Sequence, residues 1–189
     1  MRKIPLILIV ILWFTSCGGG LSKEQLSDYG EIAYSDMISY IAIGYQTKWK
    51  DMNPREMNLS PMYRQMSSYA GFSIEDINGD GRRELLLGEE FPNGEYVLYD
   101  ICCFSGKDAS FIHLKCGGKT DYFQINTDGI IIESISTSGS AQKGFRLKDD
   151  KLIEVDTWTN NLRRIHLEKF SQLDTVLLYN QDTDGNEPK

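Results

Sequence analysis

Residues that commonly build metal centres and catalytic sites are scarce in this chain. Its 189 residues include four cysteines and two histidines. No C-x-x-C pair occurs, and His113 and His166 stand alone, which argues against a zinc site. The G-x-S-x-G and H-E-x-x-H motifs of hydrolases and metalloproteases are also absent. We therefore expect a protein that is not an enzyme. The alternative is an envelope hydrolase or a glycan-processing accessory enzyme that lacks a complete catalytic motif.

Basic residues are also few relative to acidic ones. The chain has 20 lysines and arginines against 27 aspartates and glutamates, and its formal net charge is -7. No basic stripe or basic-aromatic patch is present, so nucleic acid is not expected as a partner. The acidity suits solubility and the binding of cations.

Long apolar runs are confined to the N-terminus. Arg2 and Lys3 form a short basic region, and Ile4–Phe14 forms an apolar run of the length found in secretory signals. That run is too short to span a bilayer comfortably as a permanent helix. We therefore expect residues 1–16 to be a signal peptide.

The end of this signal predicts a lipid anchor. The segment Phe14-Thr15-Ser16-Cys17 is similar to a bacterial lipobox, in which a cysteine is lipidated and becomes the mature N-terminus. Residues 17–21 would then hold the lipidated Cys17 and a glycine-rich tether, and the acyl chains would attach the protein to a membrane. The alternative is an ordinary secretory signal cut near the same place. The first hypothesis places the protein in the cell envelope, as a lipoprotein facing the periplasm or the cell surface.

An extracytoplasmic location would permit disulfides. The remaining cysteines are Cys102, Cys103 and Cys116. A hairpin turn near Gly106-Lys107 would place Cys102 opposite Phe111. Cys103 would then face Ser110, so neither lies across from Cys116. Buried thiols are the simpler expectation, and the sequence alone does not decide between thiols and disulfides.

The first part of the mature chain has a helical period. Between Ser22 and Lys48, apolar side chains recur mostly at spacings of three and four residues: Leu26, Tyr29, Ile32, Ala33, Met37, Tyr40 and Ile41. Asn53-Pro54 ends the pattern, because the residue before proline avoids helical geometry. Ser60–Tyr69 suits a short second helix with proline in its first turn. We therefore expect an N-terminal helical segment over residues 22–69.

After residue 70 the period changes toward two. Turn signals at Pro92-Asn93-Gly94, Thr127-Asp128-Gly129 and Asp149-Asp150 separate short alternating segments. This spacing predicts an antiparallel meander over residues 70–179, curled over the helix in the same single domain, and hence an α+β fold. Leu162–Leu173 fits either a hairpin or a helix. Thr175–Tyr179 reads as a last strand, and residues 180–189 as a polar tail.

The most specific chemistry begins at Asp76. Asp76, Asn78 and Asp80 place oxygen-bearing side chains at every second position, and Gly81 follows at once. In a calcium loop, positions 1, 3 and 5 supply side-chain oxygens, a glycine permits the turn, and position 7 supplies a backbone carbonyl. Position 7 is Arg82 here. The spacing therefore predicts a Ca²⁺ site.

The closure of this loop differs from that of an EF-hand. Leu87 stands at position 12, where an EF-hand needs a bidentate glutamate. Glu84 at position 9 would instead supply the closing carboxylate. The alternating Phe72–Glu75 before the loop and the apolar Leu85–Gly88 after it predict a strand, a calcium loop and a strand. The alternative is a plain Asn-Gly/Asp-Gly hairpin turn.

The run from Phe72 to Leu87 resembles a known family signature, D-x-[DN]-x-D-G-x-x-[DE]-L-[LI]. It is found in small secreted bacterial lipoproteins with calcium loops of the FG-GAP or VCBS-repeat type. The resemblance covers about residues 68–157 and continues through Tyr96–Phe104 and Lys148–Leu152. It implies a calcium-stabilised, β-rich extracytoplasmic module whose activity is generally unassigned. Because the chain has one convincing copy, the ion would brace a hairpin rather than help to build a propeller.

The C-terminal tail has a partial echo of this loop. Asn180, Asp182, Asp184 and Gly185 repeat the oxygen spacing, but Pro188 stands where the closing ligand should be. We interpret this segment as a solvated tail.

Together these features predict a binding or accessory module of the cell envelope. The expected partners are the membrane, through the anchor, and a glycan or an envelope protein. An exposed cluster containing Trp49 and Trp158 would favour a glycan, because sugars stack on aromatic faces. The alternative is that both tryptophans cover the core.

Overall fold

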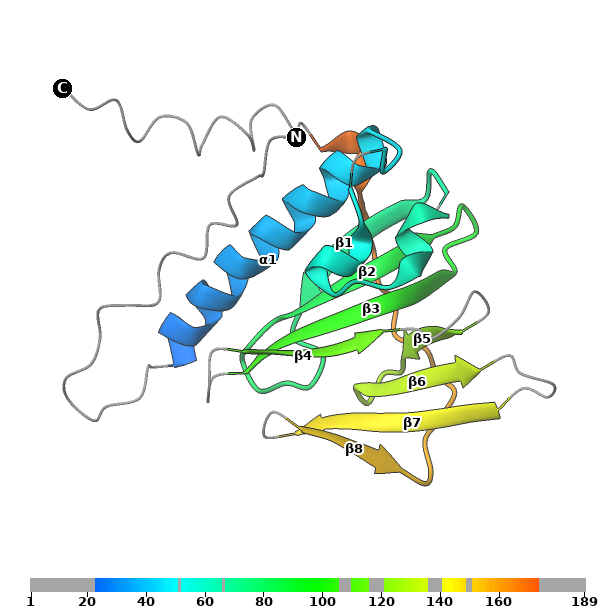
Figure 1. Cartoon of the computed structure of the whole chain (residues 1–189). Helices are drawn as coiled ribbons and strands as arrows, with labels where there is room; N and C mark the ends of the chain where they lie inside the picture. The colour runs from blue at the N-terminus through cyan, green and yellow to red at the C-terminus, as the bar shows by residue number, and fades with distance from the viewer. Residues whose placement is uncertain are drawn as a thin grey trace, which may run out of the picture.

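The structure is a computed structural model that describes residues 23–50, 52–65, 67–105, 110–115, 121–135, 141–148 and 151–173. Within these ranges, one α-helix lies on a large antiparallel sheet (Figure 1). The helix is α1 (Lys23–Gln46), and short 3-10 helices cover Pro54–Met57, Pro61–Arg64 and Phe170–Gln172. The strands are β1 (Ala70–Glu75), β2 (Glu84–Glu90), β3 (Tyr96–Ser105), β4 (Ser110–Lys115), β5 (Tyr122–Ile125), β6 (Ile130–Ile135), β7 (Ala141–Lys148), β8 (Lys151–Val155) and β9 (Glu168–Lys169). The predicted α+β class is confirmed in this coarse form, with the sheet dominant.

The sheet is largely the expected meander. Its strand order is β8-β7-β6-β5-β3-β2-β1-β9, with β4 pairing to β3 outside this path. The long strand β3 pairs with two strands on the same edge. Its second half pairs with β4, and its residue Leu98 pairs with Phe123 of β5. The register between β2 and β3 shifts at Leu87/Gly88. At Gly88 a Cβ would run into the carbonyl oxygen of Val97, so the close approach of the two backbones requires a glycine there.

Helix α1 packs on the face of the sheet formed by β1, β2 and β3 (Figure 1). Met37 and Ile41 are buried in this contact, as their helical spacing predicts. The contact also includes Leu85, Leu87 and Cys102 from the strands. Because β2 places Leu85 and Leu87 on one face and Leu86 on the other, both faces of this strand carry core residues.

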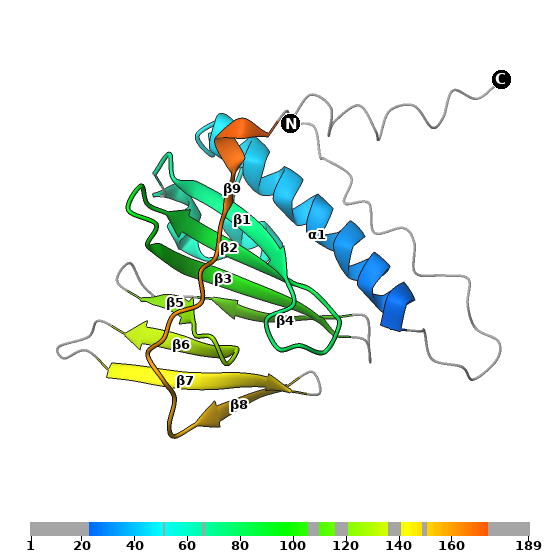
Figure 2. The same ribbon diagram turned by 180° about the vertical axis from the view of Figure 1, so that it is seen from behind.

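A long extended segment covers the opposite side of the sheet. After β8 the chain runs back across the strands to β9, which pairs with β1 (Figure 2). Ile165 and Leu167 of this segment are buried with Leu86, Ile101 and Phe123 in a second core cluster. The ambiguous Leu162–Leu173 is therefore neither a hairpin nor an α-helix. It is the second part of an extended segment, residues 156–173, which we call the crossing strap and which ends in a two-residue strand and a 3-10 turn.

Two local predictions are wrong. In place of the expected second helix over Ser60–Tyr69, the structure has the 3-10 turn Pro61–Arg64. The Ser60 hydroxyl caps this turn by accepting a hydrogen bond from the N–H of Met62. In the β3–β4 hairpin, Cys102 pairs with His113 rather than Phe111, and Cys103 with Ile112 rather than Ser110. Each β4 partner is therefore two residues later in the sequence than predicted.

Several predictions fall on residues outside the described ranges. These are the signal peptide, Cys17 and its tether, Cys116, the strand Thr175–Tyr179 and the polar tail. Among the described residues, Cys102 is a buried free thiol, and Cys103 is also buried. The same residues include no helix with the length and apolarity needed to cross a membrane.

Candidate functional site: the β1–β2 loop

The Asp76–Glu84 segment connects β1 to β2 as the sequence predicts. Glu75 ends β1 and pairs with Glu84, the first residue of β2, so the loop closes at this pair. Gly79 and Gly81 have φ values of 76° and 87°. Residues with side chains rarely adopt this left-handed conformation, which explains both glycines. The arrangement of strand, loop and strand is therefore confirmed.

Asp76 organises the turn through its carboxylate. Its Oδ1 accepts the backbone N–H groups of Gly79 at 2.6 Å and Asp80 at 3.2 Å. Its Oδ2 accepts the N–H of Gly81 at 2.9 Å. A carboxylate that accepts several backbone donors holds a short loop in one conformation.

Asp80, Asn78 and Arg82 form a second cluster in the same loop. The Arg82 guanidinium lies 2.8 Å from Asp80 Oδ2, and the Arg82 N–H donates to Asp80 Oδ1 at 2.8 Å. Asn78 Nδ2 donates to Asp80 Oδ2 at 3.1 Å. Burial alone would raise the pKa of Asp80, but the hydrogen bonds from Arg82 and Asn78 and the charge of Arg82 outweigh it and lower that pKa.

Glu84 is the buried acid of the loop, with 2% of its surface exposed. Its Oε2 accepts the N–H of Ile77 at 2.9 Å. Burial raises the pKa of Glu84 to about 8, the Ile77 hydrogen bond opposes the rise, and the charges of Asp80 and Asp76 add to it. The position therefore disfavours a carboxylate unless positive charge is brought close to it.

Two contacts that the sequence did not reveal hold the loop against the rest of the sheet. At Gly129, in the β5–β6 turn, a Cβ would run into the carbonyl oxygen of Ile77. From the crossing strap, Arg163 donates to the carbonyl oxygen of Asp76 at 3.2 Å and lies 3.1 Å from Glu75 Oε2. The only sequence signal for the first contact is the Asn-x-Asp-Gly turn at residues 126–129, whose predicted turn geometry is confirmed.

The donor atoms of the loop fit calcium in type. Ca²⁺ takes about six to eight oxygen ligands, and carboxylates, amide oxygens and backbone carbonyls all serve. The loop offers these through Asp76, Asn78, Asp80, the Arg82 carbonyl and Glu84. In the described residues, however, no group of three or more His, Cys, Asp or Glu side chains is arranged to hold a metal. Asp76 faces backbone N–H groups and Asp80 faces Arg82, so an ion would replace these hydrogen bonds.

A buried acid-base pair lies elsewhere, between the sheet and the 3-10 segments. Asp100 is fully buried, and its Oδ1 lies 2.9 Å from His113 Nε2. Its Oδ2 accepts the N–H of Ser60 at 3.0 Å. Burial raises the pKa of Asp100, and its contacts with His113 and Ser60 partly oppose the rise. Ser60 is itself fully buried, so its hydroxyl cannot meet a substrate, and we interpret the pair as a structural anchor.

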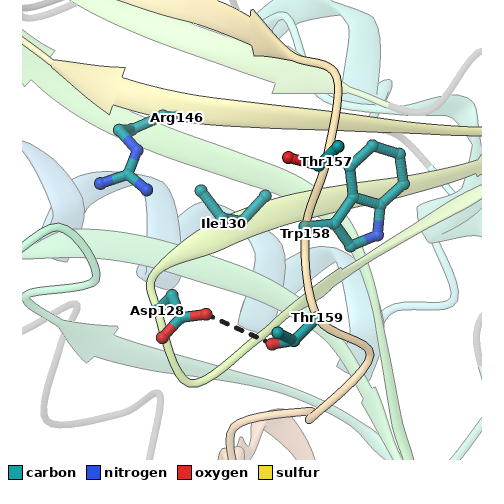
Figure 3. A pocket seen from close by; sticks show the side chains of 6 residues that line it. All are labelled: Asp128, Ile130, Arg146, Thr157, Trp158 and Thr159. Carbon is teal, nitrogen blue, oxygen red and sulfur yellow. Dashed lines mark hydrogen bonds between the residues drawn. The ribbon is translucent and has the colours of Figure 1, made fainter.

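A groove of about 630 Å³ lies on the face of β6 and β7 that the crossing strap passes over (Figure 3). Its lining residues are Asp128, Ile130, Arg146, Thr157, Trp158 and Thr159. The two tryptophans therefore have different roles. Trp49 is buried against α1 as a cover of the core, whereas Trp158 is half-buried and lines this groove.

Comparison with known proteins adds no relative. No protein-family model, no curated protein and no solved structure matches this chain. The functional argument therefore rests on the residues and their geometry.

Proposed function

We propose that this chain is a lipid-anchored binding or accessory module of the cell envelope whose β1–β2 loop binds a structural Ca²⁺. In this proposal Cys17 carries the anchor. Asp76, Asn78, Asp80, the Arg82 carbonyl and Glu84 ligate the ion. The ion stabilises the hairpin and does not act in a chemical reaction.

The observation that carries the calcium proposal is the environment of Glu84. A plain hairpin turn does not need a buried glutamate at its base with two further acids nearby. Three carboxylates share the loop with the guanidinium groups of Arg82 and Arg83. Because the charges of Asp76 and Asp80 raise the pKa of Glu84, a divalent cation among them would remove an unfavourable interaction.

A structural role for the ion fits the position of the loop. The loop contacts the Gly129 turn and Arg163 of the strap, so it lies where β1, the β5–β6 turn and the crossing segment meet. An ion bound there would fix the relative positions of three separate parts of the fold. Binding to the folded state alone raises stability by mass action.

The experiment that tests binding directly is a calcium titration of the purified full chain by calorimetry in mild detergent. We expect one site in the wild type and its loss in Asp80→Asn. Asp128→Asn is the matched control, because Asp128 also precedes a glycine in a turn but lies outside the loop. Equal binding by the wild type and Asp80→Asn would contradict the proposed ligand set.

A further inference from the structure

We propose that the groove lined by Trp158 and Arg146 binds a sugar unit that carries a carboxylate. The inference goes beyond the calcium loop and the membrane anchor, and it depends on neither. The volume of the groove, about 630 Å³, lies within the range of small-molecule sites, which is roughly 300–1,000 Å³.

Trp158 supplies a rigid apolar wall. The strap carries it over Gly144 of β7, where an added Cβ would come within 2.5 Å of ring atom Cε3. The glycine therefore makes room for the indole, and the indole is already held in place before a ligand arrives. The face of an indole is electron-rich and attracts the partly positive C–H bonds of a pyranose ring. A wall fixed in advance also lowers the entropy lost on binding.

Arg146 supplies the charge. Arg146 lies opposite Ile130 in the register of β6 and β7. The Arg146 side chain is exposed and has no hydrogen-bond or ion-pair partner among the described residues. Figure 3 shows its guanidinium at one end of the groove and the Trp158 indole at the other, with Ile130 between them. A guanidinium binds a carboxylate through two parallel hydrogen bonds, so this end of the groove favours an acidic group.

The side of the groove between these ends offers hydroxyl-binding groups. Asp128 Oδ2 accepts a hydrogen bond from the Thr159 hydroxyl at 3.2 Å, and Thr157 adds a further exposed hydroxyl (Figure 3). An exposed carboxylate that is oriented by a threonine can accept hydrogen bonds from sugar hydroxyls. The apolar wall, the hydroxyl-binding side and the cationic end correspond to the ring, the hydroxyls and the carboxylate of a uronic acid.

The test is equilibrium binding of two probes to the purified full chain in mild detergent, followed by tryptophan fluorescence and calorimetry. The first probe is a tetrasaccharide of alternating glucuronic acid and N-acetylglucosamine. The second is the same tetrasaccharide with its carboxylates reduced to alcohols. We expect the acidic probe to bind at least about tenfold more tightly, because a hydrogen bond to a charged group is worth this much or more.

Three variants separate the contributions. Arg146→Gln should bring the acidic probe down to the affinity of the reduced one, and Trp158→Ala should remove binding of both. Lys148→Gln is the matched control, because it removes another exposed cation of β7 outside the groove. Its affinities should equal those of the wild type.

The proposal is overturned if neither probe binds, if both bind equally, or if Arg146→Gln keeps the preference for the acidic probe. It is also overturned if a short acidic peptide competes as well as the acidic tetrasaccharide. Because Arg146 is exposed, its substitution should not impair folding, and equal melting temperatures will verify this. The titration is then repeated in chelator. Because the groove does not depend on the β1–β2 loop, the acidic probe should bind equally well with and without calcium.

Discussion

At the scale of single residues, two buried acids are the main feature of this protein. Glu84 and Asp100 are acids with almost no exposed surface, and burial raises the pKa of both. Asp100 has a histidine partner. The charges of Asp80 and Asp76 raise the pKa of Glu84 further, and the charge of Arg82 opposes them. This difference separates a structural acid–histidine pair from a buried acid with two further carboxylates around it.

The Glu84 carboxyl should make stability depend on pH when calcium is absent. Its pKa is about 8 in the folded protein against an ordinary 4.5, so the folded state keeps a proton that the unfolded state loses. The contribution of Glu84 to the free energy of unfolding is then highest below pH 4.5 and is lost as the pH rises to about 8. The fall is at most about 1.4 kcal/mol per pH unit. Urea unfolding in chelator across this range measures it.

Glu84→Gln should flatten this dependence, whereas Glu95→Gln, an exposed acid of the β2–β3 turn, should leave it unchanged. Equal pH slopes for the wild type and Glu84→Gln would contradict the assignment. Calcium must displace the same proton, so its affinity should rise with pH up to about 8.

The Asp100–His113 pair should contribute strongly to stability. Removing one member of a buried pair leaves the other uncompensated and typically costs about 3–5 kcal/mol. Asp100→Ala also leaves the Ser60 N–H without its acceptor. We expect a loss of this size in urea unfolding, and a smaller loss for Asp100→Asn, which keeps an oxygen for Ser60. A loss below about 1 kcal/mol for the alanine variant, the size of an exposed pair, would contradict the burial argument.

At the scale of elements, the sequence predicted best what local chemistry decides. Alternating side chains and glycine turns located β1, β2 and β3 and the turn at residues 126–129, because period and turn chemistry are local properties. The predicted β3–β4 register was wrong because the sequence between these strands has no two-residue glycine turn that would fix the register.

Contacts between distant residues could not be read from the sequence. Arg163 meets Asp76 across 87 positions, and His113 meets Asp100 only once the β3–β4 register is known. The apolar residues of Leu162–Leu173 have no regular spacing, because the shape of the sheet beneath them determines which side chains are buried. For the candidate site, the ligand spacing was visible, but the burial of Glu84 was not.

Two turn glycines test the contact between the β5–β6 turn and the loop. Gly94 and Gly129 have φ values of 81° and 72°, so alanine strains both backbones. Around Gly94 there is open space, whereas a Cβ at Gly129 would meet the Ile77 carbonyl. Gly94→Ala should cost about 1 kcal/mol, and Gly129→Ala should cost more and weaken calcium binding. Equal losses in thermal unfolding would show that the contact with Ile77 is unimportant.

At the scale of the whole molecule, two core clusters pack against one sheet. Helix α1 covers one face and the strap covers the other (Figures 1 and 2). The Asp76–Glu84 loop joins the end of β1 to the start of β2, near the strap and the β5–β6 turn. The loop therefore contacts two segments that are distant from it in the sequence.

The anchor is a property of the whole molecule that one substitution tests. If Cys17 is lipidated, Cys17→Ser should move the protein from the membrane fraction to the soluble fraction after cell fractionation. Cys116→Ser is the matched control and should leave the protein in the membrane fraction. Unchanged membrane association of Cys17→Ser would contradict the lipoprotein hypothesis.

The central claim is that calcium in the Asp76–Glu84 loop stabilises the fold, and the melting temperature tests it most directly. The full chain is melted in excess calcium and in chelator, beside Asp80→Ala. The account predicts that chelation lowers the melting temperature of the wild type, because calcium binds only the folded state. Asp80→Ala should melt at one temperature in both conditions. Identical melting of the wild type with calcium and with chelator would show that the loop is a turn and not a calcium site.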